Sequence, residues 1–332
     1  MALKSTTRDV VLVIFEGPDM SGKTTTMNGV KEYLLKEIAG RNSNLWCGNS
    51  PTFKFPVYDG VLGSSILTHL KYFNPRIVQE KFLGIEYESE TENIDRVMKC
   101  ITDFSSMQCI NKAANLSSLL DLFSYDDIVV LCDRAFLSQY IYDIAWLKFY
   151  KTGNYFTDKG YKESFKKFAL SNALMIEKAM FELAEKKGLN LHVVTELFIG
   201  NDPVINYVLS KAKEIERRID SYDTMVEYKK SVSEEFLRII KMNDSTDDEK
   251  FLIKNPEYDM QYHINSVTKT YLEAAGKQKI DIDSEDVDEI MKLIKNEFND
   301  VINNIAKNNM CKTIVKDILK VLKYDPKDFI KE

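Results

Sequence analysis

The chain has 332 residues, of which 44% are hydrophobic and 29% are charged, and its formal net charge is −6. This composition is typical of a soluble globular protein and excludes a disordered or fibrous class. The net negative charge argues against a protein whose main task is to coat nucleic acid, since that task needs a basic surface. A local basic pocket is still compatible with the sequence.

The N-terminal residues and the cysteines indicate the expected compartment. Residues 1–9 are short and polar, and the apolar run after them is too brief for a signal peptide or a membrane span. We therefore expect a cytoplasmic protein, or one of the host cytoplasm if it is viral, with no membrane partner. The five cysteines are scattered and only three histidines are present, so neither a disulfide framework nor a zinc site is expected.

The most specific motif follows the apolar run Val10 to Phe15. Residues 17–24 read Gly-Pro-Asp-Met-Ser-Gly-Lys-Thr, a complete G-x-x-x-x-G-K-[ST] phosphate-binding loop. A buried strand, a glycine-rich turn and a helix start together direct backbone N–H groups at one phosphate, so the chain is predicted to bind ATP or GTP. Lys23 would contact the β- and γ-phosphates, and the Thr24 hydroxyl would hold Mg²⁺. The residues predicted to bind the nucleotide in this loop are Gly17, Ser21, Gly22, Lys23, Thr24 and Thr25.

Three further apolar runs predict additional strands, at 128–132, at 189–199 and, more weakly, at 279–283. Helical patterns lie at about 24–38, 100–122, 162–187, 203–217 and 284–300. Strands that alternate with helices predict an α/β fold of three layers, α/β/α, with a parallel sheet of about five strands, as in P-loop NTPases. Ligands of such sheets bind at the carboxyl ends of the strands, where Gly17, Asp133 and Asp202 would lie.

A second motif narrows the class of nucleotide-binding protein. Residues 133–142, Asp-Arg-Ala-Phe-Leu-Ser-Gln-Tyr-Ile-Tyr, resemble the D-R-Y-x-x-S-x-x-A-Y stretch of thymidylate kinases. Residues 15–25 resemble the F-E-G-x-D-x-x-G-K-[ST]-T opening of the same family. Weaker matches are Phe53 to Pro56 with the R-F-P segment and Phe104 to Gln108 with the F-S-x-N-R run. Asp202-Pro203 resembles the D-x-P-E helix start, Glu216 to Asp220 resembles the lid after it, and Ile280 to Ser284 resembles the V-I-D-A-S strand.

The resemblance covers about two thirds of the chain and implies a domain plan. Residues 1–300 would form a kinase core, with a lid at about 205–222 and insertions at about 74–103, 147–165 and 224–262. The helix after the lid would lie at 231–240 or at 265–275, and the spacing to the last strand favours the second position. Residues 301–332 form a Lys-rich helical extension, whose apolar face we expect to dock on the domain or on a partner subunit.

The resemblance also implies the reaction and its catalytic residues. A nucleoside monophosphate kinase uses ATP as donor and Mg²⁺ as cofactor, and this family forms homodimers. Arg134 would clamp the acceptor phosphate, and Asp133 would bind Mg²⁺ through water or instead act as a helix N-cap or a partner of Arg134. Met20 stands where some members carry a catalytic arginine, so Arg217 or Arg218 of the lid would supply it. Asp283 would lie at the adenine.

The acceptor pocket is where the chain departs from the family pattern. Gln108 replaces the base-reading arginine, Tyr58 replaces a phosphate-contacting arginine, and Ala135 replaces a bulky residue. The Gln108 amide can pair with O4 and N3–H of thymine or uracil, or, when flipped, with cytosine. We expect dTMP or dUMP ahead of dCMP. The residues that the resemblance assigns to the acceptor are Asp19, Phe55, Tyr58, Phe104, Gln108, Arg134, Ser138, Gln139 and Tyr142.

Two other functions are compatible with the phosphate-binding loop. A deoxynucleoside kinase would need a carboxylate base after the second strand, and Asp59 is the only acid near the region 52–56. A nucleotide-dependent binding or switch module would have lost the acceptor site. The N-K-x-D motif with which GTPase switches read guanine is not present in the sequence.

Overall fold

The structure is a computed structural model, which describes residues 8–18, 21–39, 45–54, 127–138, 140–141, 144, 159–199, 232–241, 245–266 and 300–330. Its centre is a five-stranded parallel sheet in the order β2-β3-β1-β4-β5. The strands are β1 (Arg8–Glu16), β2 (Leu45–Lys54), β3 (Asp127–Asp133), β4 (Leu189–Ile199) and β5 (Met260–Ser266). Among the described strands, β1 is central and pairs with β3 on one side and β4 on the other.

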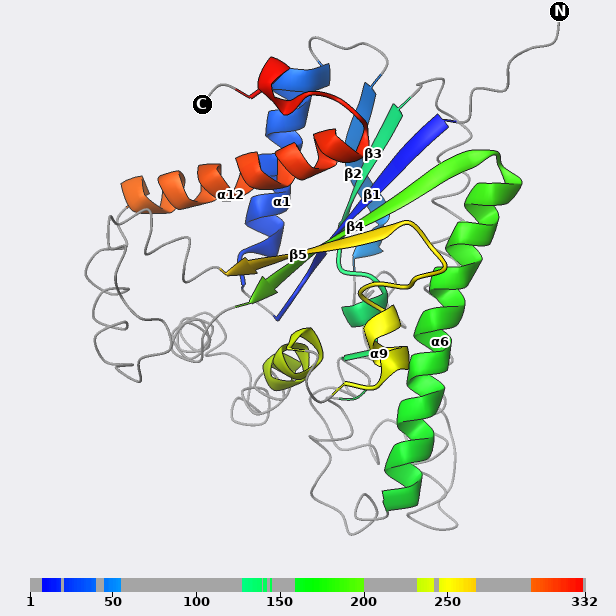
Figure 1. The fold of residues 1–332 in the computed structure, drawn as a ribbon. Coiled ribbons are helices and arrows are strands. Elements are labelled where there is room, and N and C mark those ends of the chain that lie inside the picture. Colours follow the sequence, from blue (N-terminus) through cyan, green and yellow to red (C-terminus); the bar gives the residue numbers. More distant parts are fainter. Residues whose placement is uncertain are drawn as a thin grey trace, which may run out of the picture.

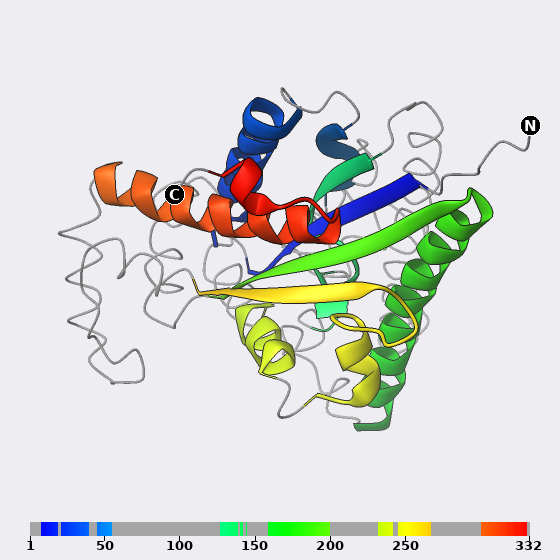
Figure 2. The ribbon, with the colours of Figure 1, turned by 45° about the horizontal axis from the view of Figure 1, so that its top comes forward.

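Helices cover both faces of the sheet (Figure 1). Helices α1 (Lys23–Tyr33) and α12 (Asp300–Val321) lie on one face, and α6 (Lys159–Lys186) lies on the other with α9 (Asp247–Phe251) and the helical residues 232–240. Figure 2 shows the same arrangement from a second direction. The predicted three-layer α/β/α class is therefore confirmed.

Two apolar cores explain why the inner strands are apolar at nearly every position. Val10, Leu12 and Ile14 of β1 belong to the core on the α6 side, whereas the intervening Val11 and Val13 belong to the core under α1 and α12. Side chains alternate between the two faces of a strand, so a strand covered on both faces needs apolar residues throughout. The same alternation continues in β3 and β4.

The predicted elements within the described ranges agree with β1, β3, β4, α1 and α6. The helix predicted at 24–38 continues beyond α1 as a π-helix, Leu34–Ala39. Most of the other predicted elements, namely strand 279–283 and helices 100–122, 203–217 and 284–300, lie outside the described residues. Strands β2 and β5 were not predicted, because both are edge strands of the described sheet with mixed polar and apolar sequences.

One predicted helix starts too early. The favoured helix at 265–275 would begin with Asn265 and Ser266, but these two residues belong to β5, and residues 267–275 lie outside the described part of the chain. The alternative position is helical at 232–240, within the stretch that we expected to be an insertion. Phe236 and Ile239 of this helix are fully buried in the core on the α6 side, so the segment is part of the packed domain.

The C-terminal extension docks on the domain, as predicted. The apolar face of α12 carries Ile314, Ile318 and Leu319, all fully buried under the sheet. Near the middle of α12, Cys311 Sγ lies 3.6 Å from the Thr26 carbonyl oxygen of α1. Across the parts of the chain that the structure describes, no helix combines the length and the apolar character needed to cross a membrane.

Candidate nucleotide-binding site

The site lies between the carboxyl ends of β1 and β3. After β1 the chain passes to β2 on one side of the sheet, and after β3 it passes to β4 on the other side. The two connections therefore diverge at this point, and such a divergence is where open α/β sheets bind ligands. The phosphate-binding loop follows β1 here, and Asp133-Arg134 closes β3 beside it.

Two glycines of the loop have positive φ angles for different reasons. Gly17 has φ 144°, and a Cβ on it would lie 2.5 Å from the Phe198 carbonyl oxygen. The loop can therefore pass close to β4 only because position 17 has no side chain. Gly22, with φ 84°, is the N-cap of α1 and has open space around it, so there the backbone conformation alone favours glycine.

The first turn of α1 offers positive charge and backbone donors to an anion. Gly22 has no side chain that could cap the helix, and no acidic residue occupies the first turn. The N–H groups at a helix start and the helix dipole favour a phosphate there. Lys23 is 3% exposed; its ammonium donates to the Pro18 carbonyl oxygen and to Ser21 Oγ at 3.2 Å, so it lies folded against the loop.

Thr24 and Asp133 meet across the site. The Thr24 hydroxyl donates to Asp133 Oδ2 at 2.8 Å, which joins the start of α1 to the end of β3. Mg²⁺ prefers oxygen ligands, such as those of hydroxyl and carboxylate groups. The Thr24 side chain is also exposed. Both residues therefore fit the predicted metal-binding role, in which Asp133 acts through water.

Arg134 has a strained backbone conformation, which a hydrogen bond to β1 holds beside the loop. Its φ is 72°, in the left-handed region, which costs a non-glycine residue about 1–3 kcal/mol. Its N–H donates to the Phe15 carbonyl oxygen at 3.0 Å, so the contact with β1 helps to hold this conformation. The side chain is 8% exposed and close enough to Glu16 to lower the pKa of that carboxyl.

Glu16 is a site residue to which the sequence analysis gave no role. It is fully buried at the end of β1, and its carboxylate accepts hydrogen bonds from Ala135 N at 2.8 Å, Ser138 N at 3.3 Å and the Ser138 hydroxyl. Burial raises the pKa of Glu16, and these hydrogen bonds and Arg134 oppose that rise. Glu16, and not Asp133, therefore accepts the backbone N–H groups at the start of the helical residues 136–138. An acid directly after the apolar run Val10 to Phe15 was the available signal.

The Ser138 hydroxyl faces Glu16 inside the protein, and the residue is fully buried. Its predicted contact with the acceptor stays a prediction. Many of the other predicted residues lie outside the described part of the chain, namely Asp19, Met20, Phe55, Tyr58, Phe104, Gln108, Gln139, Tyr142, Asp202, Arg217, Arg218 and Asp283. The structure thus brings together Gly17, Ser21, Gly22, Lys23, Thr24, Asp133 and Arg134.

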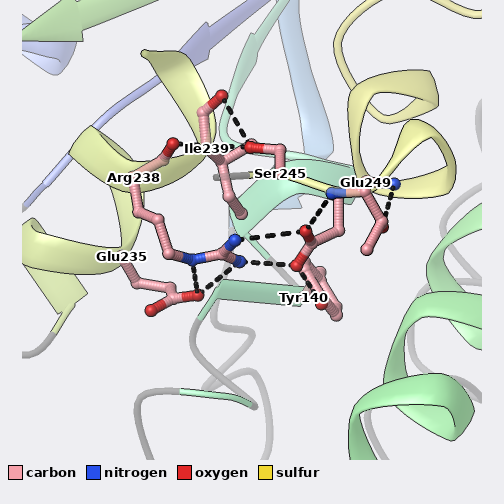
Figure 3. A network of polar contacts seen from close by, with 7 residues as sticks. Tyr140, Glu235, Arg238, Ile239, Ser245 and Glu249 are labelled. Atoms are coloured by element: carbon pink, nitrogen blue, oxygen red, sulfur yellow. Dashed lines mark hydrogen bonds and ion pairs between the residues drawn. The ribbon is translucent and has the colours of Figure 1, made fainter. Parts of the chain in front are cut away.

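A polar network supports the helix that follows Arg134 (Figure 3). The Tyr140 hydroxyl donates to Glu249 Oε1 at 2.6 Å, and Arg238 donates to both oxygens of Glu249 and, at 2.7 Å, to Glu235. Glu249 also forms a capping box with Thr246 at the start of α9. Burial alone would raise the pKa of Glu249, but the hydrogen bonds from Arg238 and Tyr140 lower it to about 2. The carboxylate is therefore ionised at neutral pH and fixes the helix against residues 232–241 and 245–251.

Comparison with known proteins gives a distant structural resemblance. No known protein family and no curated protein matches the sequence. A thymidylate kinase from Ehrlichia chaffeensis is similar at 15% identity and a TM-score of 0.34, over 88% of this chain and 100% of that one. The thymidylate kinase from Candida albicans has 14% identity and a TM-score of 0.35, over 89% of this chain and 92% of that one. Any function must therefore be argued from the residues of the site.

Proposed function

We propose that the protein is a nucleoside monophosphate kinase that transfers the γ-phosphoryl group of ATP to dTMP or dUMP. The observation that supports it best is the hydrogen bond of 2.8 Å between Thr24 and Asp133, with Lys23 and Arg134 at the same sheet edge. This arrangement combines two oxygen atoms that can bind Mg²⁺ with two cationic side chains. Both substrates carry anionic phosphates, so their reaction needs such positive charge. The family resemblance of residues 15–25 and 133–142 supplies the type of acceptor.

In the proposed reaction an oxygen of the acceptor phosphate forms a bond to the γ-phosphorus, and the bond from that phosphorus to the β–γ bridging oxygen breaks. ADP leaves with the bridging oxygen, and the product is a nucleoside diphosphate. The attacking phosphate is already ionised, so the enzyme needs no general base. The bound Mg²⁺ would supply charge neutralisation at the phosphates.

The described side chains would position the phosphates. Lys23 would turn from the loop carbonyl of Pro18 toward the phosphates, because an anion is a stronger acceptor for its ammonium. Thr24 and Asp133 would hold the metal ion. Arg134 would grip the acceptor phosphate with its planar fork, which can hold two oxygens at once.

The residues that would select the acceptor, and the lid arginines that would close over the phosphates, lie outside the described ranges. Phe104 would stack on the base and Gln108 would read its edge, with Asp19, Phe55, Tyr58, Gln139 and Tyr142 around the nucleotide. Arg217 or Arg218 would bring positive charge to the transferring phosphoryl group, and Asp283 would lie at the adenine. A homodimer is also part of the proposal, and sedimentation of the purified chain would test it.

The test is release of ADP from ATP and Mg²⁺ in parallel reactions with dTMP, dUMP, dCMP, dGMP and thymidine. The proposal requires turnover that depends on a monophosphate, with dTMP or dUMP preferred. Turnover with thymidine alone would indicate a deoxynucleoside kinase, and turnover without any acceptor would indicate a switch or a simple ATPase. Lys23→Ala should abolish the activity, whereas Lys36→Ala, at an exposed position of the π-helix, should leave it unchanged.

A further inference from the structure

A second group of ionisable side chains lies under α12, away from Thr24 and Asp133. Glu196 of β4 and His263 of β5 are directly paired in the sheet, and Asp317 of α12 approaches both from the covering layer. One ligand atom from each, His263 Nδ1 and one carboxylate oxygen from each acid, lie within 4.8 Å of one another. We propose that these three residues form a binding site for a zinc-like divalent transition-metal ion.

Two of the three separations between these atoms are close to those around such an ion. His263 Nδ1 is 3.1 Å from Glu196 Oε1 and 3.6 Å from Asp317 Oδ2. Around a tetrahedral zinc ion with bonds of about 2.0–2.1 Å, neighbouring ligand atoms are about 3.3 Å apart. An ion can therefore enter between the three atoms with shifts of a few tenths of an ångström in those two separations.

The second oxygen of each carboxylate is already held by another side chain. Asn265 donates to Glu196 Oε2 at 2.7 Å, and the Lys320 ammonium donates to Asp317 Oδ1 at 2.8 Å. Each acid thus has one oxygen anchored by a neighbour and the other directed at His263. Neighbours that orient ligands in this way are typical of metal sites, where they fix the ligand geometry before the ion binds.

A proton on His263 cannot satisfy both carboxylates. A single N–H at Nδ1 forms one good hydrogen bond, and the distance of 3.6 Å to Asp317 is too long for a second. The Glu196 side chain is 1% exposed, so its charge is poorly solvated. A divalent ion would bind both oxygens at once and would balance the two negative charges.

The ligand types indicate which ions to expect. One imidazole nitrogen with two carboxylate oxygens suits zinc, manganese or cobalt better than Mg²⁺ or Ca²⁺, which prefer oxygen ligands alone. His263 is about one third exposed, which leaves a route for entry and a fourth position for water. The ion would tie α12 to both β4 and β5. The sequence analysis expected no zinc site from scattered cysteines and only three histidines. The three ligands proposed here are far apart in the sequence, and no local motif connects them.

The test is calorimetric titration of untagged, chelator-treated full-length protein with Zn²⁺, without nucleotide or Mg²⁺, followed by the visible spectrum with Co²⁺. We expect one ion per chain, a four-coordinate cobalt spectrum and a higher melting temperature with zinc. His263→Ala and Glu196→Gln should each remove the binding. Asn265→Ala should weaken it by roughly 10–100-fold, as expected for a residue that only orients a ligand.

His192→Gln provides the matched control. His192 also touches two acids, Asp259 at 2.6 Å and Asp9 at 3.3 Å, but through opposite nitrogens, so its neighbours do not converge on one point. This variant should bind zinc like the wild type. The proposal is overturned if the folded wild type binds no stoichiometric ion, or if folded Glu196→Gln, checked by circular dichroism, binds it unchanged. Lys23→Ala should still bind zinc, so the result is independent of the proposed kinase activity.

Discussion

At the scale of single residues, the phosphate-binding loop depends on two glycines with different surroundings. Gly17→Ala would place a methyl group against the backbone of β4 in addition to straining a positive φ. We expect it to lower the free energy of unfolding by more than about 2 kcal/mol. Gly22→Ala meets open space and should cost only about 1 kcal/mol of backbone strain. Urea unfolding of both variants tests this, and equal losses would mean that β4 can move away from position 17.

The pair Thr24 and Asp133 provides a second prediction at this scale. Asp133→Asn keeps the shape of the side chain but removes the charge that would attract Mg²⁺. We expect the Mg²⁺ concentration for half-maximal ATP turnover to rise at least roughly tenfold, with the fold intact because Glu16 still caps the helix after β3. Asp248→Asn, at an exposed position of α9, is the surface control. An unchanged Mg²⁺ titration for Asp133→Asn would assign Asp133 a purely structural role.

At the scale of elements, α6 carries a buried acid that makes stability depend on pH. Glu177 is fully buried and accepts one hydrogen bond, from Asn255 at 2.8 Å, and burial raises its pKa to about 7. The folded protein binds this proton more tightly than the unfolded chain, whose Glu pKa is 4.5. The stabilisation is therefore fully present below pH 4.5 and is lost as the pH rises to about 7. The loss amounts to roughly 3 kcal/mol.

The variant Glu177→Gln should remove that dependence, because a neutral amide needs no proton to be buried. Urea unfolding between pH 4.5 and 7 should give a free energy that falls more steeply with pH for the wild type than for the variant. Glu182→Gln, at an exposed position of the same helix, should keep the wild-type slope. Parallel curves for the wild type and Glu177→Gln would show that Glu177 stays ionised in the folded protein.

How each element is covered by its neighbours decided which elements could be predicted from the sequence. Strands β1, β3 and β4 are covered on both faces, so a continuous apolar run revealed them. Strand β5 alternates, with Gln261, His263 and Asn265 between Met260, Tyr262 and Ile264, and such a short alternating run at a sheet edge has a weak signal. The phosphate-binding loop is a local motif, so the sequence alone was enough to propose it. The contact of Glu16 with Ser138 joins residues 122 positions apart, and that of Glu196 with His263 joins residues 67 positions apart, which no local pattern encodes.

At the scale of the whole molecule, the C-terminal helix shares an apolar core with elements that carry the candidate nucleotide site. Helix α12 packs on α1, whose first turn would bind the phosphates, through the contact of Cys311 with Thr26. Both helices share one apolar core with β1, β3 and β4. Loosening α12 should therefore also loosen the helix that carries Lys23 and Thr24.

Ile318→Ala tests this coupling. Ile318 is fully buried, so its truncation should cost about 2–5 kcal/mol through lost burial and an internal cavity. Because α1 and α12 share a core, we expect their backbone amides to lose protection from hydrogen exchange together and by similar free energies. Lys316→Ala, on the exposed face of α12, should change neither helix. If α12 loses protection in Ile318→Ala while α1 keeps it, the extension is a separate unit, and the nucleotide site does not depend on it.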